Sequence, residues 1–188
     1  MDANGSNVRR VFKKSARREY PTWSPDGKQI AYVRGWFIYI AILGKQEEQQ
    51  LVNGFDPAWS PDGAEIAFAR GDFGSDRLTL VNVRTGRQKR VLPEDTMPWQ
   101  RVPAWSATGE KIAFSWLNHV LPNGRLFGLV DKKTIYVVNR DGTELEQIVP
   151  EAGKAAMNPV WDPRGSSLVY VQEIDNRLQP SGSSLSTS

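Results

Sequence analysis

A single histidine and the absence of cysteine limit the chemistry that this 188-residue chain can perform. His119 is the only imidazole, and the sequence has no Gly-x-Ser-x-Gly motif, so a Ser–His–Asp hydrolase site would depend on that one residue. Without cysteine, thiolate catalysis, disulfide frameworks and cysteine-based zinc sites are excluded. We therefore expect no catalytic site, no metal site and no cofactor.

Three short segments contain residue types that occur in ion or phosphate sites. Residues 2–6 and 139–143 resemble fragments of calcium loops, but neither has the spaced acidic residues and closing Glu of a 12-residue loop. We interpret both as turns. The Gly-Asp-Phe-Gly run at 71–74 is not followed by Lys-Ser/Thr or by a helical pattern, so it predicts no phosphate-binding loop.

The charge distribution is close to balanced. Lys and Arg number 24 against 21 Asp and Glu, which gives a net charge of +3, and the basic residues are scattered in pairs. Nucleic-acid binders usually concentrate their basic charge, so we expect no nucleic-acid partner. No apolar run approaches the roughly 20 residues of a membrane helix. The polar residues 1–5 predict no signal peptide in this chain.

A motif that occurs four times predicts the strands and turns on which any functional residue must lie. Pro-x-Trp begins each copy, Gly follows the Trp by four positions, and an apolar pair then ends in an aromatic residue. The tryptophans are Trp23, Trp59, Trp105 and Trp161, and the glycines are Gly27, Gly63, Gly109 and Gly165. Because each Trp holds the same place in its repeat, we expect all four to pack between repeats as structural residues.

Each copy predicts a β-hairpin. Proline is tolerated at the first residue of a strand, and Ser-Pro-Asp-Gly favours a tight turn with positive φ at the glycine. A second hairpin pattern follows at 36–52, 78–92 and 134–149. Each repeat therefore predicts four antiparallel strands, the unit of a β-propeller blade. We expect an all-β fold with complete blades at 20–53, 56–93 and 102–150.

The motif Pro-x-Trp-Ser-Pro-Asp-Gly-x-x-Ile-Ala-Phe resembles the repeat of TolB-type propellers, which are WD-repeat-like. The same repeat occurs in the propellers of tricorn protease and of prolyl-oligopeptidase relatives. The resemblance covers about residues 1–173, and it implies a ring of six to eight blades. It also implies a periplasmic or secreted location and a protein or peptide ligand on one face or in the central channel.

The two ends of the chain are out of phase with the blades. Residues 1–12 resemble an orphan outer strand, residues 158–175 predict only the inner hairpin of a blade, and 176–188 predict a Ser-rich flexible tail. A composite blade would join the outer strand of one chain to the inner hairpin of another. We expect about four blades per chain and an eight-bladed ring closed by strand exchange in a homodimer. A lone four-bladed ring and a piece of a longer propeller stay open as alternatives.

The longer loops predict the binding face. In a four-stranded meander, the segments 71–76, 93–101 and 116–133 all lie on the side opposite the Asp-Gly turns. Residues in these loops, or just before the inner strands, are the candidates. They are Arg18, Tyr20, Phe55, Asp56, Trp99, Arg101, His119, Arg125, Phe127, Met157 and Asn158.

These observations favour a noncatalytic propeller scaffold for protein or peptide binding and assembly. One alternative is an accessory propeller that gates substrates for a peptidase-like enzyme. Another is a propeller that binds a carbohydrate or small molecule on aromatic side chains.

Overall fold

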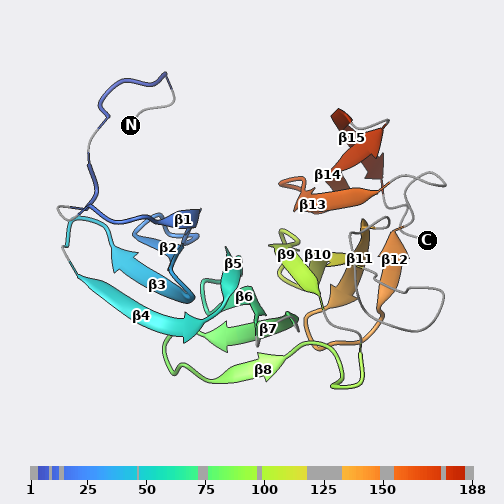
Figure 1. Cartoon of the computed structure of the whole chain (residues 1–188), viewed down its shortest axis with the longest axis horizontal. Coiled ribbons are helices and arrows are strands. Elements are labelled where there is room, and N and C mark those ends of the chain that lie inside the picture. The colour runs from blue at the N-terminus through green and yellow to red at the C-terminus, as the bar shows by residue number, and fades with distance from the viewer. Residues whose placement is uncertain are drawn as a thin grey trace.

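The computed structural model describes residues 4–8, 10–12, 15–45, 47–71, 76–96, 99–117, 133–148, 155–174 and 177–184. All regular elements within these ranges are β-strands, and they form four antiparallel sheets. The all-β prediction is confirmed. The sheets follow one another along an open arc, in which β1 and β13 lie at opposite ends of the concave side (Figure 1).

The first three sheets are four-stranded meanders, which we call blades 1, 2 and 3. Blade 1 contains β1 (Glu19–Trp23), β2 (Gln29–Arg34), β3 (Phe37–Ile42) and β4 (Glu48–Asn53). Blade 2 contains β5 (Phe55–Trp59), β6 (Glu65–Arg70), β7 (Arg77–Asn82) and β8 (Gln88–Arg90). Blade 3 contains β9 (Gln100–Trp105), β10 (Lys111–Leu117), β11 (Lys133–Asn139) and β12 (Glu146–Ile148).

The fourth sheet differs from the prediction. Blade 4 has three strands, β13 (Ala156–Trp161), β14 (Ser167–Ile174) and β15 (Arg177–Ser184). The segment expected to be a flexible tail thus pairs with β14 from Ile174↔Arg177 to Ser167↔Ser184. A β-ladder is made by backbone groups, so a segment with few apolar residues can join a sheet without any hydrophobic pattern in its sequence.

The N-terminal segment also differs from the prediction. Residues 4–8 and 10–12 belong to no strand, although an outer strand was expected there. A strand needs a sheet edge to pair with, and the fourth strand position of blade 1 is already filled by β4. Phe12 nevertheless contacts blade 1, because its ring lies edge-on to Tyr32 with centroids 5.4 Å apart.

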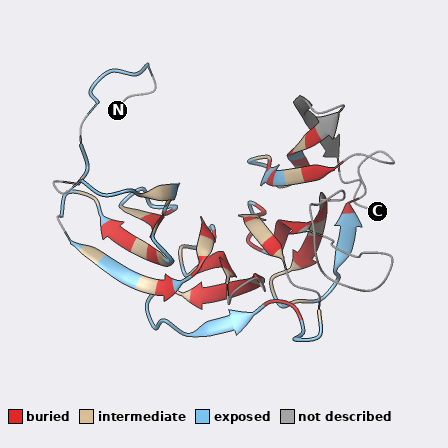
Figure 2. Ribbon diagram, in the orientation of Figure 1, coloured by how far each residue is buried: buried red, intermediate tan, exposed pale blue. Residues whose placement is uncertain are grey.

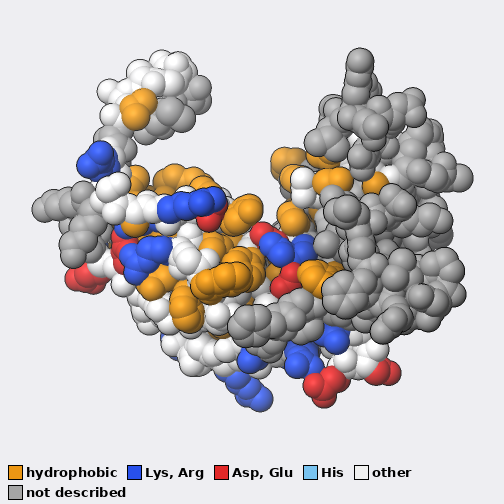
Figure 3. Space-filling view, viewed as in Figure 1, with side chains coloured by type: hydrophobic (Ala, Val, Ile, Leu, Met, Phe, Trp, Pro, Cys, Tyr) orange, Lys and Arg blue, Asp and Glu red, His pale blue; other side chains and the backbone are white. Residues whose placement is uncertain are grey.

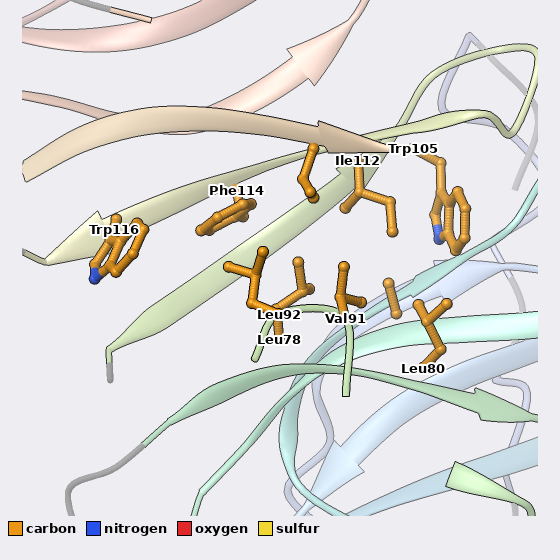
Figure 4. Packing of buried hydrophobic residues seen from close by; sticks show 10 residues of the cluster. Leu78, Leu80, Val91, Leu92, Trp105, Ile112, Phe114 and Trp116 are labelled. Carbon is orange, nitrogen blue, oxygen red and sulfur yellow. The ribbon is translucent and has the colours of Figure 1, made fainter. Parts of the chain in front are cut away.

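The hydrophobic core is divided among the junctions between blades. Buried residues run consecutively along the middle strands β2, β6 and β7, whereas the outer strand β8 is exposed (Figure 2). In the junction between blades 2 and 3, Leu78 and Leu80 of β7 pack with Trp105, Ile112 and Phe114 of blade 3 (Figure 4). Similar clusters join blade 1 to blade 2 and blade 3 to blade 4.

The repeat tryptophans occupy two different environments. Trp59, Trp105 and Trp161 are 8–9% exposed, as expected for residues packed between blades. Trp23 is 58% exposed, which contradicts that expectation. The reason is positional, since each buried Trp packs against the preceding blade and blade 1 is the first of the arc.

Candidate binding face

Each inner strand is bent at the residue before its proline. Tyr20, Asp56, Val102 and Asn158 have φ between 52° and 55°, and the pairing of each strand with its neighbour shifts register there. Such a bulge re-aims the side chains next to it. The four bulges therefore give the first residues of the inner strands a different direction from the rest of each strand.

Arg101 ties blade 3 to blade 2 beside the second bulge. Its Nε donates to Asp56 Oδ2 at 2.6 Å, and its Nη1 donates to Asp76 Oδ2 at 3.0 Å. The backbone N–H of Val102 also donates to Asp56 Oδ2, at 3.3 Å. Both carboxylates are buried, with 6% and 8% of their side chains exposed, whereas the Arg101 side chain is 30% exposed. Burial opposes the charge of Arg101, but the bond to Asp56 and the field of both carboxylates outweigh it and raise its pKa.

Asp76 also holds the segment that leads into blade 3. Its backbone carbonyl accepts the N–H groups of Trp99 and Gln100, at 2.8 and 3.1 Å. The Gln100 side chain is buried and accepts the N–H of Leu78 at 2.8 Å. The ends of two predicted loops are thus fixed to each other by hydrogen bonds.

An aromatic pair lies beside this charged cluster. The rings of Trp36 and Phe55 meet edge to face with centroids 5.4 Å apart, and the Arg101 guanidinium lies 5.3 Å from the Phe55 ring centre. Trp36 is 69% exposed, although it rests on a half-buried Phe55. Hydrophobic side chains lie beside basic and acidic ones near the middle of the arc (Figure 3). The arrangement offers a large apolar surface held on a rigid charged base.

A second charged cluster lies on blade 1. Arg18 and Arg34 both form ion pairs with Glu48. Burial opposes ionisation of Glu48, but the hydrogen bond from Arg18 and the charge of Arg34 lower its pKa. The guanidinium of Arg18 also lies 4.0 Å from the centre of the Phe12 ring. Arg18 is therefore engaged within blade 1, where it holds the N-terminal segment.

A family model describes the chain as a TolB beta propeller domain over residues 1–185. The chain belongs to this family.

Solved structures agree with this TolB-type fold. TolB from Acinetobacter baumannii superimposes with a TM-score of 0.72 at 17% identity, over 90% of this chain and 41% of that one. Oligogalacturonate lyase from Vibrio parahaemolyticus superimposes with a TM-score of 0.61 at 20% identity, over 87% of this chain and 48% of that one. Acylaminoacyl peptidase from Pyrococcus horikoshii superimposes with a TM-score of 0.60 at 17% identity, over 88% of this chain and 32% of that one. At these low identities the superpositions show a shared fold alone, and the chain spans less than half the length of each relative. No curated protein matches it.

The TolB-type fold brings some of the predicted site residues together. Phe55, Asp56 and Arg101 form one cluster, and Trp99 joins it through its backbone bond to Asp76. Tyr20, at 56% exposure, lies at the bulge of β1. The remaining predicted residues are placed elsewhere or are not described. Met157 and Asn158 are the second and third residues of β13, where the Asn158 N–H donates to Ser115 Oγ at 3.0 Å. His119, Arg125 and Phe127 lie outside the described residues.

Two members of the cluster were not among the predicted residues. Trp36 follows Gly35, which has φ of 63° in the turn between β2 and β3, on the same side as the long loops. A large aromatic residue at such a turn is a signal that could have identified it. Asp76 lies at the end of a predicted loop, but its pairing with a residue 25 positions away has no local signature.

Searches for other kinds of site gave two negative findings for the part of the chain that the structure describes. No group of three or more His, Asp or Glu side chains there could hold a metal ion. No helix there is long and apolar enough to cross a membrane.

Proposed function

We propose that the chain is a noncatalytic propeller scaffold that binds a protein or peptide on the face formed by Trp36, Phe55 and Arg101. The observation that carries the proposal is the 69% exposure of Trp36 beside a cluster held by two buried carboxylates. Trp and Arg are the residue types most enriched at the centres of protein interfaces. A rigid base also lowers the entropy lost when a partner binds.

The experiment uses a phage-displayed library of random peptides, selected on the immobilised full chain. We expect enriched peptides whose binding weakens at least about 30-fold on Trp36→Ala, the loss of one interface hot spot. Leu145→Ala is the control, because Leu145 is an exposed apolar residue in the hairpin between β11 and β12, outside both proposed interfaces. Peptides that bind both variants equally, or a selection that enriches none, would contradict the assignment. If the chain instead bound specific oligosaccharides on a glycan array, the carbohydrate alternative would be favoured.

We also propose that a second copy of the chain completes the ring. The support comes from two incomplete parts of the structure, which are the three-stranded blade 4 and the N-terminal segment that belongs to no described sheet. Light scattering after size-exclusion chromatography should give twice the 21.1 kDa mass of the chain. A mass of 21.1 kDa at all concentrations would show that the chain does not pair with itself.

A further inference from the structure

Two of the three internal junctions share a hydrogen bond from the repeat tryptophan. Trp105 Nε1 donates to the carbonyl of Ala58 at 3.1 Å, and Trp161 Nε1 donates to the carbonyl of Ala104 at 3.2 Å. Both bonds run from the inner strand of one blade to that of the preceding blade. Trp59 is equally buried against blade 1, although its indole N–H has no hydrogen-bond partner among the described residues.

The junctions share a second contact, between successive turns. A Cβ built on Gly63 would lie 3.7 Å from Pro25 Cδ, and one on Gly109 would lie 3.5 Å from Pro61 Cδ. The turn of each blade therefore rests on the first residue of the preceding turn. In the junction between blades 3 and 4, Gly165 makes the same approach to the Ala107 side chain, at 3.5 Å.

The surface that receives the next blade is also the same in each junction. Ala31, Ala67 and Ala113 of the second strands are completely buried, and each belongs to the core cluster that contains the next blade's Trp. Every junction is thus asymmetric. A leading face offers Trp and Gly, and a trailing face offers a carbonyl, a small apolar residue and the start of a turn.

The two ends of the arc carry the unmatched halves of this junction. On blade 1, Trp23 is 58% exposed, and a Cβ built on Gly27 would meet nothing within 4 Å. On blade 4, Val160 and Val169 occupy the positions of the internal alanines and are 60% and 49% exposed. Pro163 of blade 4, the counterpart of Pro25 and Pro61, is exposed as well.

We propose that the leading face of blade 1 binds the trailing face of blade 4 in a second copy of the chain. This inference rests on the proposed ring closure and assigns its surfaces. Trp23 Nε1 donates to the Val160 carbonyl of the second copy, the indole covers Val169, and the Gly27 turn rests on Pro163. Two such head-to-tail contacts close a ring between two chains, because each chain offers one face of each kind.

The N-terminal segment fits the same arrangement. Residues 7–12, NVRRVF, resemble residues 87–92, RQKRVL, in which Leu92 is buried in the junction next to Phe114. Phe12 contacts Tyr32, the residue of blade 1 that corresponds to Phe114. The segment therefore corresponds to the outer strand of a blade that would precede blade 1. In the assembly it becomes the fourth strand of the second copy's blade 4, beside β15, which pairs only with β14 among the described strands.

The test uses two charged variants, Trp23→Glu and Val169→Lys, measured by light scattering. Each variant alone alters both junctions of the dimer, so we expect self-association to weaken by about 1,000-fold, as for the loss of two hot spots. An equimolar mixture should restore the dimer, because one junction then has two unaltered faces and the other pairs Glu with Lys. Trp36→Glu is the matched control and should leave the mass unchanged, since Trp36 is exposed on a different face.

The outcomes separate the two proposals. A monomeric wild-type chain would overturn ring closure and this interface together. A dimeric wild type that stays dimeric with Trp23→Glu would overturn only the interface. A mixture that stays monomeric would contradict head-to-tail contact between these two faces. Circular dichroism should show that both variants keep the strands of the single chain and lose at most the N-terminal strand formed on assembly, because both substituted side chains are exposed in the single chain.

Discussion

Trp105 and Trp23 hold the same place in the repeat, yet one is 9% exposed and the other 58%. The strands around them have the same order and direction, so the difference comes from the neighbouring blade. A repeat of this kind specifies one blade and the two surfaces by which that blade contacts its neighbours on either side. Stability in such arrays depends on contacts between neighbouring repeats, and the terminal repeats lack one of them.

The largest effect should separate these two tryptophans. Trp105→Ala should lower the free energy of unfolding by about 3–5 kcal/mol, because it leaves a cavity between blades 2 and 3. It also removes the donor to the Ala58 carbonyl. Trp23→Ala should change it by less than about 0.5 kcal/mol at concentrations where the chain is monomeric. Urea denaturation over a range of protein concentrations measures both values. Equal losses would mean that Trp23 is buried within a single chain.

A smaller effect should separate two outer turns. Gly142 and Gly86 both have positive φ, 100° and 70°, in the hairpins β11–β12 and β7–β8. A Cβ on Gly142 would lie 2.2 Å from the carbonyl oxygen of Val91 in blade 2, whereas a Cβ on Gly86 would meet nothing within 4 Å. Gly86→Ala should cost about 1 kcal/mol from backbone strain alone. Gly142→Ala should cost at least about 1 kcal/mol more, because the junction must also open. Thermal melting compares the two. Similar melting temperatures for the two variants would show that blades 2 and 3 can move apart at this turn without loss of stability.

The smallest effect should appear in acid. Hydrogen bonds from the Ser60 hydroxyl, the Ala64 N–H and Arg140 of blade 3 lower the pKa of Asp62 to about 2. A carboxylate with a lowered pKa in the folded chain stabilises it above the unfolded value near 4, and that contribution is lost as the pH falls toward 2. Both side chains are partly exposed, so Arg140→Met should lower stability by no more than about 1 kcal/mol at pH 6. The difference from wild type should shrink between pH 4 and pH 2.

The control for this prediction is Arg17→Met. Arg17 pairs with Glu19 two residues away, and its side chain is 85% exposed. This variant should match the wild type across the same range in a pH series of urea midpoints. An Arg140→Met curve parallel to that of the wild type down to pH 2 would show that the pair across the junction adds no stability.

The repeat was sufficient to predict the blades, but it was insufficient to predict how they meet. Tight turns and apolar strand patterns are local signals, and they were enough to predict the all-β fold of antiparallel sheets. The cluster of Asp56, Asp76 and Arg101 is formed by two blades, so no single segment contains its pattern. β15 was missed for a different reason, because its backbone pairs with β14 along a sequence without strand-like alternation.

The bends at Tyr20, Asp56, Val102 and Asn158 have a practical consequence for how this surface can change. Four unlike side chains, one aromatic, one acidic, one aliphatic and one amide, share one backbone conformation within 3° in φ. The backbone there does not depend on which side chain it carries. Substitutions at Tyr20, Val102 and Asn158 can therefore be combined into a library that varies the chemistry of the face, while Asp56 is kept because it pairs with Arg101 across the junction between blades 2 and 3.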